Sequence, residues 1–285
     1  KKFNLDEELP EILKLHSEQE KILEEQNQFF LLEGVAGTGK TTILLYRFVG
    51  NVKAMMEQQK FQPDKFLFVT HNERLKVQIV KSLRYFFDED EMRLVSRSVK
   101  SVDEAIKELI GGFQYQSNFD ELKRLTRKKF KKILAGNKID TDLFWEEYRG
   151  ILRGYNLNGK KRILEKDVYL EELGRRRGKI DYSQREEFYA IASDLERSLS
   201  RDEHLDPNKG GWDDLDLCKT LQREIKKGNT QTEVDFFYVD EVKEFDENEL
   251  SVFLKLLYPN GLLCGSDDIT DPGVEEWDNE NLWKT

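Results

Sequence analysis

The 285-residue sequence contains only two cysteines, Cys218 and Cys264. Two thiols exclude a disulfide framework and a cysteine-based zinc site, and they suit a reducing compartment. The sequence also lacks any apolar stretch near the ~20 residues that span a bilayer. Residues 1–6 lack the apolar core of a signal peptide. We therefore expect an intracellular protein, nuclear or cytoplasmic, with no membrane partner.

An excess of basic residues is also missing. The chain has 46 Lys and Arg against 56 Asp and Glu, and this net charge of −10 does not by itself indicate nucleic-acid binding. Charged residues make up 36% and hydrophobic residues 38%, which is typical of a soluble, helix-rich protein of one large or two ordinary domains. Basic residues do cluster within residues 123–132, 160–162 and 175–179. These clusters either contact a nucleic-acid backbone or form solvated helix faces and loops.

What the sequence does contain is a phosphate-binding pattern. Residues 34–42 read GVAGTGKTT and match G-x-x-x-x-G-K-[ST]. A strand-like run precedes them and a helix-like run follows, so the turn presents the free N–H groups and positive dipole end of a helix to a phosphate. Lys40 would reach the β- and γ-phosphates, and the Thr41 hydroxyl would bind Mg²⁺. The candidate nucleotide-binding residues of this loop are Gly34, Ala36, Gly37, Thr38, Gly39, Lys40, Thr41 and Thr42.

Strand-like and helix-like segments alternate in the first third of the chain and again near its end. The predicted strands are residues 29–33, 65–70, 92–99, 234–239 and 261–265, and the predicted helices are residues 41–58, 73–87, 102–110 and 247–257. Such alternation predicts a parallel sheet flanked by helices, an α/β fold. The intervening segment, residues 113–228, has the apolar spacing of charged helices. We therefore predict one α/β domain interrupted by a mainly α-helical insertion.

A second acidic motif follows the apolar run VDFFYV, where the chain continues with Asp240 and Glu241. In P-loop proteins an Asp at the end of such a strand holds Mg²⁺. The adjacent Glu241 would be the general base that deprotonates the attacking water. The alternative is a strand end with ordinary solvated acids. With the loop upstream, the pair predicts hydrolysis of a nucleoside triphosphate.

A possible guanine-reading element, N-K-x-D, also occurs. It comprises Asn137, Lys138 and Asp140. GTPases place a D-x-x-G element between the P-loop and this motif, whereas the segment from 41 to 136 contains none. We therefore interpret the match as a turn between helices and keep a GTPase as an alternative.

Other segments carry a family resemblance. Residues 15–19 read LHSEQ, which places Gln19 21 positions before Lys40. The remaining segments are FLFVTHN at 66–72, SVKS at 98–101 and DEVKEF at 240–245. With the loop variant AGTGKT, this set resembles the UvrD/Rep-type superfamily 1 helicases over nearly the whole chain. The resemblance implies a RecA-like ATP-binding domain, residues 1–112 and 229–285, and an insertion similar to the family's subdomain 1B, residues 113–228.

The resemblance also implies a function. The chain is then the motor domain of a helicase or single-strand translocase that couples Mg²⁺-dependent ATP hydrolysis to 3′ to 5′ movement on DNA or RNA. Gln19 would read the adenine edge, Lys40 and Glu241 would be catalytic, and Thr41 and Asp240 would bind the metal. The residues implied to contact single-stranded nucleic acid are Thr70, Asn72, Ser98, Ser101 and Trp277. Trp277 would either stack on a base, for ~1–3 kcal/mol, or pack on its own domain.

Three departures from the family pattern leave an alternative function open. Lys243 and Glu244 stand where motif II usually has Gln and Asp, and the motif III segment from Gly265 has Ser266 and no Gln. Motifs IV to VI are not found in these residues. We therefore expect the second RecA-like domain and its arginine finger either to be supplied in cis, by sequence outside these residues, or to be missing. Loss of such an Arg costs roughly 10³–10⁵ in rate, so this chain alone would hydrolyse ATP poorly. The alternative is a helicase-derived nucleotide-binding scaffold with little turnover.

Overall fold

The structure is a computed structural model. It describes residues 10, 13–24, 27–71, 73–110, 119–135, 139–154, 162–173, 180–202, 213–228, 233–245 and 247–268. By packing, the described residues divide into two compact units. The first lies within residues 1–101, 233–244 and 257–285, and the second lies within residues 102–232 and 245–256.

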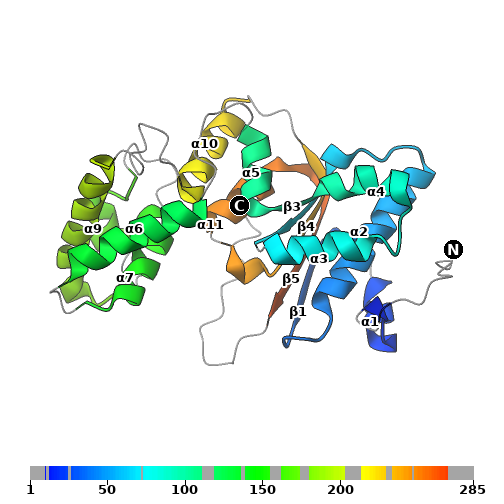
Figure 1. Ribbon diagram of the computed structural model, residues 1–285, viewed down its shortest axis with the longest axis horizontal. Helices are drawn as coiled ribbons and strands as arrows, with labels where there is room; N and C mark the ends of the chain where they lie inside the picture. Colours follow the sequence, from blue (N-terminus) through cyan, green and yellow to red (C-terminus); the bar gives the residue numbers. More distant parts are fainter. Residues whose placement is uncertain are drawn as a thin grey trace. The chain divides into compact units, whose positions relative to one another are not determined.

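A five-stranded parallel sheet forms the centre of the first unit, with the order β1-β5-β4-β2-β3 (Figure 1). The strands are β1 (Phe29–Gly34), β2 (Phe66–Thr70), β3 (Val99–Ser101), β4 (Val234–Asp240) and β5 (Leu257–Asp268). Parallel strands covered on both faces read as continuous apolar runs, and all five residues of β2 are buried. The predicted α/β fold with a parallel sheet is confirmed, and four of the five predicted strands lie where the sequence placed them.

The fifth predicted strand, residues 92–99, is wrong. Glu89–Val95 form helix α4, residues 96–98 form a 3₁₀ turn, and β3 begins only at Val99. The Asp88 carboxylate accepts the N–H of Glu91 at 2.9 Å, and the Glu91 carboxylate accepts the N–H of Asp88 at 3.1 Å. This reciprocal capping box favours a helix start, which the apolar residues that follow had obscured.

Helices α2 (Lys40–Glu57) and α3 (Glu73–Leu83) share a buried cluster with one face of the sheet. Phe48 of α2 contacts Phe68 and Tyr238 edge to face, with ring centroids 5.5 and 5.3 Å apart. Phe68 pairs in register with Tyr238, and Tyr238 pairs with Cys264. The core of the first unit is therefore an aromatic layer between α2 and the middle strands.

The same strands turn polar two residues further along. Because alternate residues of a strand share a face, Thr70, Asp240 and Ser266 follow Phe68, Tyr238 and Cys264 on the face that α2 covers. Thr70 pairs in register with Asp240 and with Ser101. The apolar layer therefore ends in a buried polar row at the carboxyl ends of the strands.

The second unit is helical. It contains α5 (Val102–Ile110), α6 (Phe119–Leu134), α7 (Thr141–Glu147), the π-helices η4 (Tyr148–Arg153) and η5 (Val168–Leu173), the 3₁₀ turn η6 (Tyr182–Gln184), α9 (Arg185–Ser200), α10 (Asp214–Lys226) and α11 (Glu247–Leu256). Phe144 packs between Phe130 and Phe188, with ring centroids 4.1 and 3.9 Å away. Helices α5 and α11, which the sequence-based boundaries assign to the ATP-binding domain, pack on α10. The boundaries at 112 and 229 stay a prediction.

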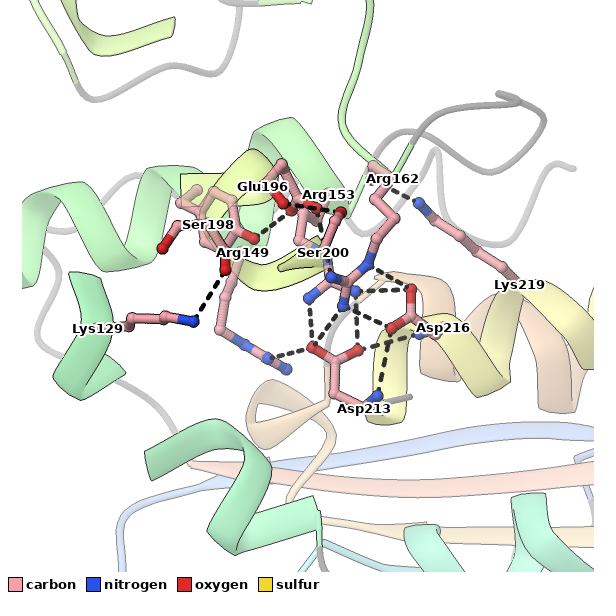
Figure 2. Close-up of polar contacts among 11 residues, drawn as sticks. Lys129, Arg149, Arg153, Arg162, Glu196, Ser198, Ser200, Asp213, Asp216 and Lys219 are labelled. Atoms are coloured by element: carbon pink, nitrogen blue, oxygen red, sulfur yellow. Dashed lines mark hydrogen bonds and ion pairs between the residues drawn. The ribbon is translucent and has the colours of Figure 1, made fainter. Parts of the chain in front are cut away.

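A buried charge network joins several elements of this helical unit (Figure 2). Arg153 has no exposed side-chain surface, and it bonds both carboxylate oxygens of Asp213 and one of Asp216. Arg162 bonds both oxygens of Asp216, at 3.1 and 2.7 Å. Asp213 and Asp216 also cap the start of α10 through each other's backbone N–H groups. The two aspartates of this capping box thus accept hydrogen bonds from two arginines. Bidentate pairs of this kind fix the orientation of the side chains strongly.

Among the described helices, none combines the length and the hydrophobicity that crossing a bilayer requires.

Candidate nucleotide site

The loop between β1 and α2 depends on glycine for its shape. Gly37 and Gly39 both have φ of +82°, a backbone conformation that side chains disfavour. The hydroxyl of Thr38 donates to the carbonyl oxygen of Val35 at 2.8 Å and tightens the turn. Gly39 is the N-cap of α2 and provides no side-chain cap, so the first N–H groups of this 18-residue helix keep their capacity to bind an anion.

Lys40 folds back over this loop. Its Nζ donates to the carbonyl oxygens of Gly34 and Val35, each at 2.8 Å. A Cβ on Gly34 would lie 3.0 Å from Thr38 Oγ1 and 3.6 Å from Lys40 Cδ, so a side chain there would crowd both. The ammonium group is thus held at the mouth of the loop that the sequence predicts to bind phosphate.

Gln19 lies against the same loop. It belongs to α1 (Ser17–Leu23), where its Oε1 accepts the N–H of His16 at 2.9 Å. Its Nε2 donates to the carbonyl oxygen of Thr38 at 2.8 Å. A Cβ on Gly39 would lie 2.5 Å from this Nε2 atom. The structure therefore brings Gln19 to the loop, while its contact with adenine stays a prediction.

Asp240 lies beside the start of α2. Its Oδ1 accepts hydrogen bonds from the Thr41 hydroxyl at 3.2 Å and from the Ser266 hydroxyl. Asp240 is 1% exposed, and within the described structure its Oδ2 atom has no hydrogen-bond partner. Burial raises the pKa of Asp240 above the usual range, and the hydrogen bonds from Ser266 and Thr41 oppose this increase. The two predicted metal ligands, Thr41 and Asp240, are therefore brought together.

Glu241 follows directly in a left-handed backbone conformation, with φ of +57°. A residue other than glycine pays roughly 1–2 kcal/mol for this geometry, and such strain is concentrated at functional sites. The side chain of Glu241 is exposed, unlike the buried Asp240. This turn separates the two acids, so Asp240 packs beside α2 and Glu241 reaches solvent.

The residues present fit a magnesium–nucleotide complex. Mg²⁺ is usually bound by one or two carboxylates together with substrate phosphates, not by an all-protein cage. In the part of the chain that the structure describes, no group of three His, Cys, Asp or Glu could hold a metal by itself. The unpartnered, buried Asp240 Oδ2 and the adjacent Thr41 hydroxyl supply oxygen donors beside a phosphate-binding loop.

The predicted nucleic-acid residues have mixed positions. Thr70 and Ser98 have no exposed surface, and Ser101 is 7% exposed. The Ser98 hydroxyl donates to the carbonyl oxygen of Pro63 at 3.0 Å. Asn72 and Trp277 lie outside the described residues. The role of all five in binding a strand stays a prediction, and the buried side chains favour a structural role for Thr70 and Ser98.

The basic clusters are partly used within the protein. In residues 123–132, Lys129 pairs with Asp202 at 2.7 Å and Arg127 pairs with Asp142, whereas Lys128, Lys131 and Lys132 are exposed. In the second cluster, Arg162 is held in the network of Figure 2, and Lys160 and Lys161 are not among the described residues. Residues 175–179 also lie outside them. Among the described residues of these clusters, the exposed lysines of α6 are thus the candidates for contact with a nucleic-acid backbone.

The N-K-x-D match has a structural explanation at its last position. Asn137 and Lys138 lie outside the described residues, but Asp140 is the N-cap of α7. Its carboxylate accepts the N–H groups of Asp142 and Leu143 at 2.8 and 3.1 Å. These bonds lower the pKa of Asp140. A helix cap accounts for this aspartate without a guanine base.

Sequence reasoning missed the contacts that the end of β5 makes. Ser266, which counted as a departure from the family, donates to Asp240. Lys243, a second departure, pairs with Asp267, with Nζ and Oδ2 3.4 Å apart. Neither contact follows from local spacing because each joins segments more than twenty positions apart. The register of β4 with β5 would have been needed to find them.

A parallel sheet with a glycine-rich loop after one strand and an aspartate at the end of another defines a P-loop nucleotide-binding domain. A family model described as the UvrD/REP helicase N-terminal domain matches residues 15–264. The chain therefore belongs to the UvrD/REP helicase family, and it is an ATP-binding motor domain of the helicase type. A comparison with curated proteins gave no match.

Proposed function

We propose that this chain binds ATP with Mg²⁺ at the β1–α2 loop and the end of β4, and that its hydrolysis drives 3′ to 5′ movement along a nucleic-acid strand. The observation that carries this proposal is the 3.2 Å contact between Thr41 Oγ1 and Asp240 Oδ1. It joins the phosphate-binding loop to the acidic strand end, which are 199 positions apart in the sequence. The direction of movement rests on the family alone.

Each residue at the site has a chemical task in this proposal. The N–H groups at the start of α2 bind the phosphate oxygens, and Lys40 moves from its loop carbonyls to the β- and γ-phosphates. Thr41 and Asp240 would hold Mg²⁺, and the bound ion would supply positive charge beside the phosphates. Glu241 orients and deprotonates the attacking water. Its exposed position beside the buried Asp240 supports this division of roles.

Nucleic acid enters the proposal through exposed cationic residues. Lys128, Lys131 and Lys132 of α6 are exposed, so they are able to contact phosphates of a strand. Such contacts would give binding that weakens as the salt concentration rises. Asn72 and Trp277 keep their proposed roles at the strand-binding surface.

The test is ATP hydrolysis in protein that carries the second RecA-like domain, measured with and without single-stranded DNA or RNA. We expect single-stranded DNA or single-stranded RNA to stimulate ATP hydrolysis. Glu241→Gln should remove turnover while ATP binding persists. If the wild type and Glu241→Gln both bind ATP normally and neither hydrolyses it, the scaffold alternative is favoured. Loss of ATP binding in the wild-type protein would refute both.

A further inference from the structure

Ser266 makes contacts with both residues of the acidic motif. Its hydroxyl donates to Asp240 Oδ1, and its Oγ lies 3.4 Å from the backbone nitrogen of Glu241, which donates to it. Ser266 is 1% exposed, so water does not compete freely for these bonds. One buried hydroxyl thus connects the predicted metal ligand with the backbone of the predicted general base.

The sheet register explains why Ser266 reaches this position. Tyr238 pairs with Cys264, and Val239 pairs with Gly265, so the next residues on the two strands are Asp240 and Ser266. A Cβ on Gly265 would lie 3.1 Å from side-chain atoms of both Leu31 and Val242, so the strand is tightly enclosed there. The Ser266 hydroxyl is therefore placed by a strand that packs closely against neighbouring side chains.

The two oxygens of Asp240 have different environments. Oδ1 accepts from two hydroxyl groups, those of Ser266 and Thr41, whereas Oδ2 is buried with no partner among the described residues. A carboxylate held through one oxygen has a fixed rotamer and keeps its other oxygen for a ligand. Ser266 differs from Thr41 because its hydroxyl is not itself expected to bind the metal.

We propose that Ser266 is a positioning residue that orients the Asp240 carboxylate for Mg²⁺. This inference rests on the proposed Mg²⁺–ATP function and adds a residue from β5 to it. The serine therefore supports the motor interpretation, although its departure from the motif III pattern had suggested a degenerate scaffold.

The test measures nucleotide affinity, not turnover. A non-hydrolysable ATP analogue is titrated into each protein with Mg²⁺ and again with EDTA. Ser266→Ala should bind the analogue like the wild type in EDTA, but it should lose about tenfold of the tightening that Mg²⁺ provides, as expected for one hydrogen bond to a charged group. Tyr238→Phe is the matched control because it removes a hydroxyl from β4, the strand that carries Asp240, and this hydroxyl accepts a hydrogen bond from Asn51. It should keep the full Mg²⁺ effect.

A second pair separates the hydroxyl from packing in this tight position. Ser266→Thr and Ser266→Val add the same bulk, but only Thr keeps a hydroxyl. We expect Mg²⁺ to tighten binding about tenfold more in the Thr variant than in the Val variant. Equal Mg²⁺ effects within this pair, with a normal effect in the wild type, would overturn the role of Ser266. A wild type that binds the analogue equally with Mg²⁺ and EDTA would overturn the proposed metal site itself.

Discussion

Lys243 and Asp267 form an ion pair in which Nζ and Oδ2 are 3.4 Å apart. Lys243 lies in the 3₁₀ turn η8 (Val242–Glu244) after β4, and Asp267 lies near the end of β5. Lys243 departs from the motif II pattern, and Asp267 lies in the divergent motif III segment. Two regions that each depart from the family pattern in the sequence therefore contact each other in the fold.

This ion pair should contribute a measurable coupling energy. The side chains are 31% and 9% exposed, so solvent screens the pair only in part. In a double-mutant cycle of Lys243→Met and Asp267→Asn, we expect about 0.5–1 kcal/mol of coupling in the free energy of unfolding. The Arg97–Asp64 pair, which is 61% and 71% exposed, is the control and should show almost none. Strictly additive effects at Lys243 and Asp267 would contradict the prediction.

The backbone at Glu241 should favour glycine. Because φ is +57°, Glu241→Gly should be more stable to urea than Glu241→Ala by about 1 kcal/mol, the reverse of the order at ordinary positions. Gln59 has the same φ at the end of α2 and is the matched control. Its Gly and Ala variants should show the same order of stability. Turnover should fall only in the Glu241 variants, and a more stable Ala variant at either site would argue against strain there.

Gly39, the N-cap of α2, and Gly50, inside the same helix, offer a contrast. A Cβ at Gly39 would meet Gln19 Nε2 at 2.5 Å in a strained backbone, whereas a Cβ at Gly50 meets nothing within 4 Å. Gly39→Ala should therefore weaken ATP binding at least tenfold by displacing Gln19 and distorting the loop. Gly50→Ala should bind ATP normally and gain about 0.5–1 kcal/mol of stability. Calorimetric titration and urea unfolding of both variants check this, and unchanged ATP affinity in Gly39→Ala would refute it.

Lys219 should give the helical unit a stability that rises with pH. Burial, with the nearby Arg153, lowers the pKa of Lys219 to about 8 from 10.5 in the unfolded chain. Between these values the unfolded state binds more protons than the folded state, so the free energy of unfolding increases with pH. Between pH 8 and 10.5, the free energy of unfolding of the wild type should increase by about 2–3 kcal/mol relative to that of Lys219→Met. Urea unfolding across this range checks it, and parallel pH profiles would contradict it.

The parts of the site that depend on local sequence could be predicted. Residues 34–42 carry their own turn, helix start and lysine, so the loop follows from the pattern alone. The apolar run before Asp240 and Glu241 predicts a strand that ends at this pair, and β4 ends at Asp240. The capping box of Asp88 and Glu91 is also local, and the predicted strand there is wrong because this cap starts a helix despite the apolar residues that follow.

The remaining contacts depend on packing between distant segments. The pairing of β4 with β5 sets the contact of Ser266 with Asp240, and no spacing rule gives that register. Likewise, Arg162 belongs to a basic cluster in the sequence. In the structure it pairs with Glu196 and Asp216, two carboxylates on separate helices. Charge in the sequence therefore overstated the surface available to nucleic acid.

The most direct measurement of the central claim is equilibrium binding of ATP with Mg²⁺ to the wild type and to Lys40→Ala. Lys40 Nζ donates to the loop carbonyls of Gly34 and Val35, so its removal should alter the phosphate site more than the fold. We expect the wild type to bind ATP in preference to GTP, and Lys40→Ala to lose at least tenfold in ATP affinity. Equal ATP affinity in the two folded proteins, or a preference for GTP, would contradict the account.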